Sequence, residues 1–289
     1  MQNISLESYL NQILSAKTTE SYLYTISHFL KTNPKAKRYK YKDVVKYMDE
    51  VTQKQNNIQY RIRILSAIKK YYDYLVTVGQ RSDHPCKRLT IKKNCNPAIQ
   101  VQDLFSSEEL QMLMNRENRY WFLEMRNNVL LSLLIYQGLT SEEIISLELK
   151  DVDLDSGTIY IKASKSLNRR TLELTPKQII PIKKYIDEVR PEILMGKADK
   201  LILSKLGKPI SVDGIHSVIE TLKPLFLDRK LNPQTIRMSV ICNWLNEKKL
   251  PLETVQSLAG HKWPGTTEKY IKVDANAERE LINRYFPVL

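Results

Sequence analysis

The chain has 289 residues, 42% of them hydrophobic and 27% charged, which is ordinary for a folded globular protein and argues against wholesale disorder. No stretch approaches about 18 consecutive apolar residues, so we expect no membrane span, and the N-terminus lacks the pattern of a secretory signal. The formal net charge is +13, with 18 Lys and Arg against 7 Asp and Glu in the first 100 residues and 27 against 25 in the rest.

The basic first part indicates a module that binds a polyanion such as nucleic acid. The alternative is a solvated basic face that aids solubility. Four segments here place apolar residues at helical spacing, namely 5–14, 18–32, 40–54 and 56–79. We expect Thr18 or Thr19 to cap the second helix and Gly79 to close the fourth. Residues 1–90 are therefore predicted to form a helical domain that binds nucleic acid.

Ten of the 16 tyrosines lie in this part, interleaved with Lys and Arg, although core packing is the expected role of any single one. The basic side chains expected to contact the nucleic acid are Arg61, Arg63, Lys69, Lys70, Lys87, Arg88, Lys92 and Lys93. Residues 81–100 hold two prolines and five basic residues without a sustained period, which predicts an extended tether. We place the basic linker between the domains at residues 91–103.

From residue 104 the pattern is mixed. Ser106 lies three residues before Glu109, as in a capping box, and an apolar helical stretch over 124–149 is broken at Gly138. Alternating residues around a lysine-bearing turn predict a β-hairpin over 157–174. Further helices are expected at 176–190, 211–226, 233–247, 252–260 and from 275. The predicted fold is mainly α with a small antiparallel β-sheet, and residues 104–289 form its second domain.

The most specific motif is the segment LAGHKWPGTTEKY, in which a helix is expected to end at Gly260, His261 follows, and Tyr270 comes nine residues later. Upstream, Gln234 and Arg237 share one helical face at spacing i, i+3. Taken alone, such a tyrosine is usually core or surface, and such a histidine is often part of a helix C-cap. Together they resemble the C-terminal motifs of the tyrosine recombinase (phage integrase) family: an HxLRH box, then LGH, then TT..Y.

The resemblance covers essentially the whole chain. Residues 126–155 look like the first catalytic box of the family, 157–174 like the hairpin that carries its catalytic lysine, and 1–90 like its core-binding domain. It implies a site-specific DNA recombinase that cleaves and rejoins DNA through a 3′-phosphotyrosyl intermediate. No metal or nucleotide cofactor is expected, and the three scattered cysteines, which have no zinc-ligand or disulfide-framework spacing, fit a reducing cytoplasm.

The resemblance also implies roles for single residues. Tyr270 matches the nucleophile. Arg237 matches the second family arginine, which holds non-bridging phosphate oxygens, and His261 matches a hydrogen-bond donor to the phosphate. Lys165, in the hairpin turn, matches the general acid that protonates the 5′-oxygen leaving group, and Glu143 matches an acidic residue that supports the site.

Two positions depart from the family pattern. Gln234 stands where the HxLRH box has its first histidine, and Thr140 stands where the first box normally has the arginine of GLR. Loss of one donor to a developing oxyanion costs ~2.7–4 kcal/mol. Another cation could fill the place, the enzyme could be slow, or the protein could bind DNA without cleaving it. The candidate cations are Arg126, Arg169, Arg170 and Lys262.

The AGHK.P.TTEKY wording resembles integrases of Bacteroidetes-type mobile elements, some of which also lack this arginine, and this favours the first account. The implied partners are double-stranded DNA and three further copies of the chain, in a tetramer on DNA. The tail 275–289 would dock on the next copy, and Tyr285 is expected to pack there. Alternatives from other classes are a catalytically silent DNA-binding protein and an RNA- or junction-binding module.

Overall fold

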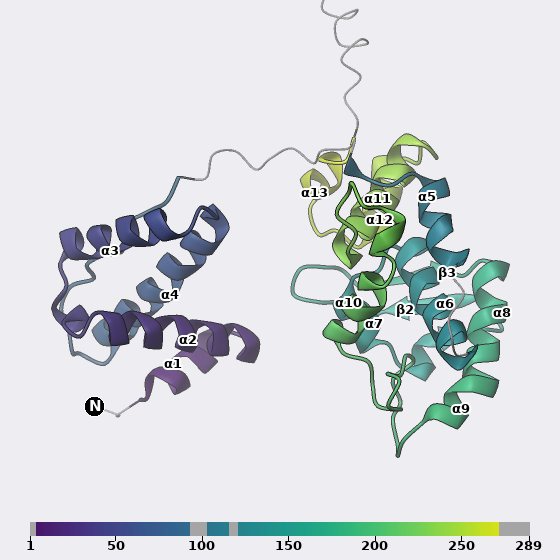
Figure 1. Cartoon of the computed structure of the whole chain (residues 1–289), viewed down its shortest axis with the longest axis horizontal. Helices are drawn as coiled ribbons and strands as arrows, with labels where there is room; N and C mark the ends of the chain where they lie inside the picture. The colour runs from purple at the N-terminus through teal and green to yellow at the C-terminus, as the bar shows by residue number, and fades with distance from the viewer. Residues whose placement is uncertain (1–3, 93–102, 116–120, 272–289) are drawn as a thin grey trace, which may run out of the picture. The chain divides into compact units, whose positions relative to one another are not determined.

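The computed structural model describes residues 4–92, 103–115 and 121–271, which fall into two compact units, Met1–Asn96 and Pro97–Leu289 (Figure 1). Both units are mainly helical, and the second contains a small antiparallel sheet, so the predicted fold class is confirmed. Among the described helices, none is long and apolar enough to cross a membrane.

The first unit contains the four expected helices, α1 (Leu6–Ile13), α2 (Ala16–Thr32), α3 (Tyr41–Lys54) and α4 (Ile58–Thr77), with a 3₁₀ turn at Ala36–Arg38. Helix α4 contacts each of the other three, and its Ile68 and Tyr72 are fully buried. The Tyr72 hydroxyl donates to the carbonyl of Ala36 at 2.8 Å, so the polar group of this buried side chain has a hydrogen-bond partner. The core of the unit therefore forms around α4.

The helix ends agree with expectation in one case and not in another. Gly79 follows α4 with φ +73°, a conformation that glycine adopts without strain. The predicted cap of α2 at Thr18 or Thr19 is wrong, because the helix begins one turn earlier with Ser15 as N-cap and Thr19 is buried within it. The intervening residues, Ala16 and Lys17, are good helix formers and extend the helix.

The prediction of an extended tether over residues 81–100 is wrong for its first half. Cys86 is fully buried, and Leu89 and Ile91 pack against the core of the four-helix unit. These apolar side chains follow no helical or strand period, so the sequence pattern gave no sign that they are buried. Residues 93–102, which make up most of the expected linker, lie outside the described residues.

The second unit contains helices α5 (Ser107–Met112), α6 (Trp121–Ile135), α7 (Ser141–Ser146), α8 (Pro176–Lys184), α9 (Arg190–Ile193), α10 (Val212–Glu220), α11 (Pro233–Asn246), α12 (Leu252–Ala259) and α13 (Pro264–Glu268). A π-helical turn, Tyr185–Val189, joins α8 to α9. The expected capping box of Ser106 and Glu109 starts α5. The expected tail from 275, including Tyr285, lies outside the described residues.

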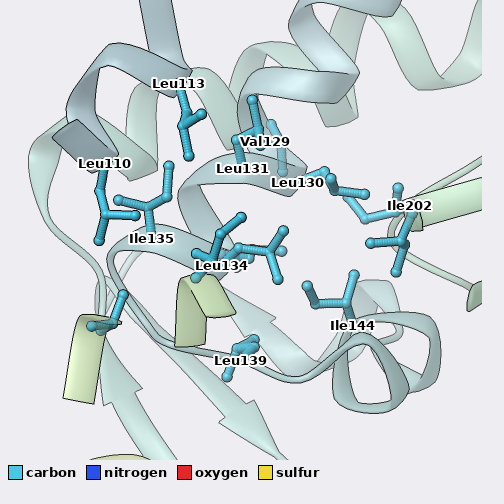
Figure 2. Close-up of a cluster of buried hydrophobic side chains, with 14 of the residues drawn as sticks. Leu110, Leu113, Val129, Leu130, Leu131, Leu134, Ile135, Leu139, Ile144 and Ile202 are labelled. Atoms are coloured by element: carbon cyan, nitrogen blue, oxygen red, sulfur yellow. The ribbon is translucent and has the colours of Figure 1, made fainter. Parts of the chain in front are cut away.

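Helix α6 is surrounded by other elements and carries apolar residues on nearly all sides, as a fully buried helix does. Figure 2 shows its Val129 and Leu134 among side chains that include Leu110 of α5, Ile144 of α7 and Ile202. Gly138 follows α6 with φ +57°, and a Cβ there would lie 3.2 Å from Val240 Cγ1 of α11. This tight glycine turn brings the start of α7 next to α11.

The sheet has three antiparallel strands in the order β1 (Val152–Asp153), β2 (Thr158–Ile161) and β3 (Arg170–Glu173). The predicted hairpin is confirmed as β2 and β3, while β1 was not predicted. Ile159 pairs with Leu172 and Ile161 with Arg170, so Arg170 falls on the same face as the buried apolar residues. Strand alternation thus directs an arginine into the interior.

Candidate active site

Glu143 lies at the centre of a buried cluster at the start of α7. Thr140 is the N-cap of this helix: its hydroxyl accepts the Glu143 N–H, and Glu143 Oε2 accepts from the Thr140 N–H at 2.9 Å and its hydroxyl at 3.0 Å. Oε1 accepts from Nη1 of Arg170 at 2.6 Å. Burial acts to raise the pKa of Glu143, but the hydrogen bond and charge of Arg170 leave it below its ordinary value. Glu143 is thus an ionised acceptor that orients its neighbours.

Arg170 is fixed on two further sides. Its Nε donates to the carbonyl of Leu258, at the end of α12, at 2.7 Å, and its side chain is only 4% exposed. Gly260, the next residue but one, has φ +72°, and a Cβ there would lie 2.5 Å from Nη1 of Arg170. The arginine therefore ties β3 to α7 and α12, and it leaves room only for glycine at position 260.

Arg237 projects from α11 into the same cluster. Its Nη1 donates to the carbonyl of Gly138, its Nη2 donates to the carbonyl of Ala259 at 2.6 Å, and Glu143 lies 3.9 Å away. Burial lowers the pKa of Arg237, but an arginine stays protonated at neutral pH. A pocket of about 460 Å³ beside the start of α11 is lined by Arg237 together with Gln234 and Thr140. A guanidinium thus sits next to a space large enough for a phosphate group.

His261 follows the left-handed Gly260 that ends α12. It is 6% exposed, and its Nδ1 shares a hydrogen bond of 2.8 Å with the hydroxyl of Thr267. Burial, reinforced by the positive charges of Arg237 and Arg170, lowers the pKa of His261 to about 4. The imidazole is therefore neutral at pH 7 and can offer one N–H to a ligand.

Tyr270 lies directly after α13 and packs face to face with His261, at 6.3 Å between ring centroids and 15° between planes. Its N–H donates to the carbonyl of Thr267 at 3.0 Å, and its own carbonyl accepts from Asn246 Nδ2 at 2.9 Å. Burial raises the pKa of Tyr270, an effect that the nearby Arg237 opposes. The phenol is thus protonated at rest and is held by its own chain.

The hairpin turn that carries Lys165 is fastened to the segment around His261. The N–H of Asn168 donates to the carbonyl of Gly260 at 2.8 Å, and Lys262 Nζ donates to the carbonyl of Lys165 at 3.0 Å. Lys165 itself is exposed. By contrast Lys162, the other lysine of the hairpin, is engaged by the carboxylates of Glu148 and Asp151 at 3.0 and 3.1 Å. Of these two lysines, Lys165 is the one whose ammonium is available to a ligand.

Three of the four cations considered for the charge missing at position 140 are bound elsewhere, and the fourth is exposed. Arg126 is buried in α6, where its guanidinium donates to the side chain of Asn127. Arg170 is bound to the carboxylate at the centre of the cluster, and Lys262 to the hairpin turn. Arg169 is exposed. None of the four is among the described residues that line the pocket beside Thr140.

The basic side chains of the first unit that were expected to contact DNA differ in their exposure and in their contacts within the protein. Lys69 Nζ donates to the carbonyl of Lys87, and Lys70 pairs with Asp73 at 3.0 Å. Arg63 lies over the Tyr60 ring. Arg61 is half-buried, and the exposed members are Arg63, Lys87, Arg88 and Lys92, while Lys93 lies outside the described residues.

Three contributors to the cluster were missed from the sequence: the structural role of Arg170, the hydroxyl of Thr267 and the amide of Asn246. A signal existed for Arg170, because strand alternation places it on the buried face. Within the described residues, no group of three or more His, Cys, Asp or Glu is arranged to hold a metal ion.

Family models and curated relatives match most of the chain. The model of the phage integrase family matches residues 104–277, and that of the phage integrase N-terminal SAM-like domain matches residues 6–79. Tyrosine recombinase XerD of Listeria monocytogenes serotype 4b is 23% identical over 283 residues, covering 95% of this chain and 94% of that protein. Tyrosine recombinase XerC of Psychromonas ingrahamii is 29% identical over 215 residues, covering 73% and 68%.

Solved structures of similar fold include DNA complexes. The XerH site-specific recombinase in a post-cleavage complex with palindromic difH substrate has a TM-score of 0.73 at 19% identity, covering 92% of this chain and 79% of that one. The Tn1549 transposon integrase with a circular intermediate DNA has a TM-score of 0.70 at 12% identity, covering 98% and 100%. At these identities the likeness shows a shared fold.

Proposed function

Since the chain belongs to the phage integrase family, we propose that it is a site-specific DNA recombinase that cleaves and rejoins DNA through a covalent 3′-phosphotyrosyl intermediate. The observation that carries this proposal is the convergence of Tyr270, His261 and Arg237, in which a phenol stacks on a neutral imidazole beside a buried guanidinium. This arrangement offers a nucleophile and two hydrogen-bond donors to one phosphate.

In the proposed reaction, the Tyr270 oxygen forms a bond to phosphorus while the bond from phosphorus to the 5′-oxygen breaks. Arg237 and His261 donate to the non-bridging oxygens as charge builds on them. The phenol loses its proton to solvent as it attacks, and Lys165 gives a proton to the leaving 5′-oxygen, so the step takes up and releases one proton. Because the phosphotyrosyl bond keeps the energy of the broken phosphodiester, reversal of these steps rejoins DNA without ATP. Glu143 keeps Arg170 and the start of α7 in place.

The basic first unit would hold double-stranded DNA, with the exposed Arg63, Lys87, Arg88 and Lys92 as the leading phosphate contacts. We further propose that four copies act together on two duplexes, that the tail 275–289 links neighbouring copies, and that the protein works in the cytoplasm. An origin in a Bacteroidetes-type mobile element, with integration, excision or inversion as the outcome, stays a prediction.

The test is a cleavage assay with a nicked duplex that carries the cognate site, identified from DNA flanking the gene. The nick lets the cleaved fragment diffuse away, so the covalent adduct accumulates. We expect an adduct with the wild type, none with Tyr270→Phe, and a normal amount with the control Tyr160→Phe, which alters a partly exposed tyrosine of β2. DNA binding without any adduct would instead establish a catalytically silent DNA-binding protein, the alternative that Thr140 makes worth testing.

A further inference from the structure

The pocket beside the start of α11 contains charge that the family resemblance did not assign. It is lined by Thr140, Gln234 and Arg237 and also by two lysines, Lys223 and Lys230. Both lysines come from the segment between α10 and α11, far in sequence from Thr140. Thr140 lines this same space, so the pocket lies next to the position that the usual arginine occupies.

The two lysines differ in their availability. Lys223 is bound to Glu220 Oε1 at 2.6 Å, so its charge is already compensated. Lys230 is exposed, and in the part of the chain that the structure describes it has no ion pair. Its neighbour Leu231 is 1% exposed, which anchors the backbone next to it. Lys230 thus lines the pocket from a fixed stretch of backbone, and its ammonium has no ion pair among the described residues.

The start of α11 adds to the positive character of the pocket. Asn232, the N-cap, and Pro233, the first helical residue, both line it, so the positive end of a 14-residue helix faces the same space. Arg237 lies one turn further along this helix. A phosphate in the pocket would thus meet the helix terminus, the Arg237 guanidinium and the Lys230 ammonium together.

We infer that Lys230 binds a non-bridging oxygen of the scissile phosphate and supplies, from the loop before α11, the charge that Thr140 does not carry. The inference rests on the proposed recombinase function. An ammonium is a single point charge, whereas an arginine fork binds two oxygens at once. Lys230 is thus expected to support cleavage, but less effectively than an arginine at position 140 would.

The experiment measures the rate of adduct formation at saturating protein on the nicked duplex. We expect Lys230→Ala to slow cleavage by ~100- to 1,000-fold, the effect of losing one donor to a developing oxyanion. Lys230→Arg should retain activity. The matched control, Lys183→Ala, removes an exposed lysine of α8 that pairs with Asp187 and does not line the pocket, and it should change the rate by less than about threefold.

Two further arms separate a catalytic from a structural role. Thr140→Arg should restore cleavage in the Lys230→Ala background, because the charge returns from the other side of the pocket. A substrate with a methylphosphonate at the cleavage site has no charge there to balance, so Lys230→Ala should cleave it at nearly the wild-type rate. A merely misfolded variant would fail on both substrates.

The outcomes also distinguish this inference from the proposed function. If the wild type forms no adduct that depends on Tyr270, the recombinase proposal itself fails. If the wild type cleaves and Lys230→Ala cleaves equally fast, or if its defect persists on the methylphosphonate and with Thr140→Arg, the role of Lys230 is overturned while the recombinase proposal stands.

Discussion

Replacing Gly260 with alanine would press a methyl group against the buried guanidinium of Arg170. A Cβ at this position lies 2.5 Å from Nη1 of Arg170 and 3.1 Å from the carbonyl oxygen of Asn168. The guanidinium cannot turn aside freely, because Glu143 and the carbonyl of Leu258 hold it at 2.6 and 2.7 Å. The substitution must therefore displace the arginine from its carboxylate.

The magnitude follows from two contributions. The left-handed φ of +72° costs an alanine about 1–2 kcal/mol. Separating the buried Arg170 and Glu143 costs a further ~3–5 kcal/mol, because each charge loses its partner. Gly196 provides the control: its φ is +80°, and a Cβ there meets nothing within 4 Å, so Gly196→Ala carries the backbone cost alone. We expect the two variants to differ by about 3–5 kcal/mol in the free energy of unfolding.

Urea unfolding followed by tryptophan fluorescence measures this difference in the intact chain. All three tryptophans, Trp121, Trp244 and Trp263, lie in the second unit, so their emission reports that unit alone. In an Arg170→Ala background, the excess cost of alanine at position 260 should largely disappear. Equal unfolding midpoints for the two glycine variants in the wild-type background would refute the idea that Arg170 is rigidly held.

Three other predictions address the site and the basic unit. Because the pKa of His261 is lowered to about 4, the unfolded chain binds a proton between pH 6.5 and 4 that the folded chain does not, so stability falls over this window as the pH drops. In His261→Gln this loss, which amounts to up to about 3 kcal/mol, should be absent. Urea midpoints measured at pH 7 and pH 4.5 test this, and an equal fall of the midpoint in the wild type and in His261→Gln would contradict it. Lys165→Ala should lower the cleavage rate by ~100- to 10,000-fold on ordinary DNA. On DNA in which sulfur replaces the bridging 5′-oxygen the rate should stay the same, because a thiolate leaves without taking up a proton. An equal defect on both substrates would exclude Lys165 as the acid. Replacing exposed Lys87 and Arg88 by alanine should make the slope of log affinity against log salt shallower by about 1.8, while Lys183→Ala in α8, whose lysine pairs with Asp187, should leave it unchanged.

Local patterns predicted those elements that depend on residues close in sequence. The apolar period over residues 56–79 corresponds to α4, and the alternation over 157–174 to the β2–β3 hairpin. Helix α13 and strand β1 were not predicted, because five and two residues are too few for any period to be recognised. The buried Cys86 was assigned to a tether for a similar reason: a few irregularly spaced apolar residues can anchor a loop without forming a pattern.

The candidate residues around Tyr270 and Arg237 were found by motif, whereas the contacts that hold them were not. Arg170 is bound to Glu143, 27 residues away, and to the carbonyl of Leu258, 88 residues away. Neither partner can be read from the sequence around Arg170. Lys230 was overlooked because a single loop lysine has no distinguishing neighbours until the fold places it beside Thr140.

The way in which Tyr270 is held has a genetic consequence. Its ring stacks on His261, its N–H bonds to Thr267 and its carbonyl accepts from Asn246, all within one polypeptide. If Tyr270 is the nucleophile, as proposed, these contacts predict that each copy uses its own tyrosine. On that proposal, an allele that changes Tyr270 and another that changes Arg237 are expected not to complement each other in the same cell, because neither product carries a complete active site.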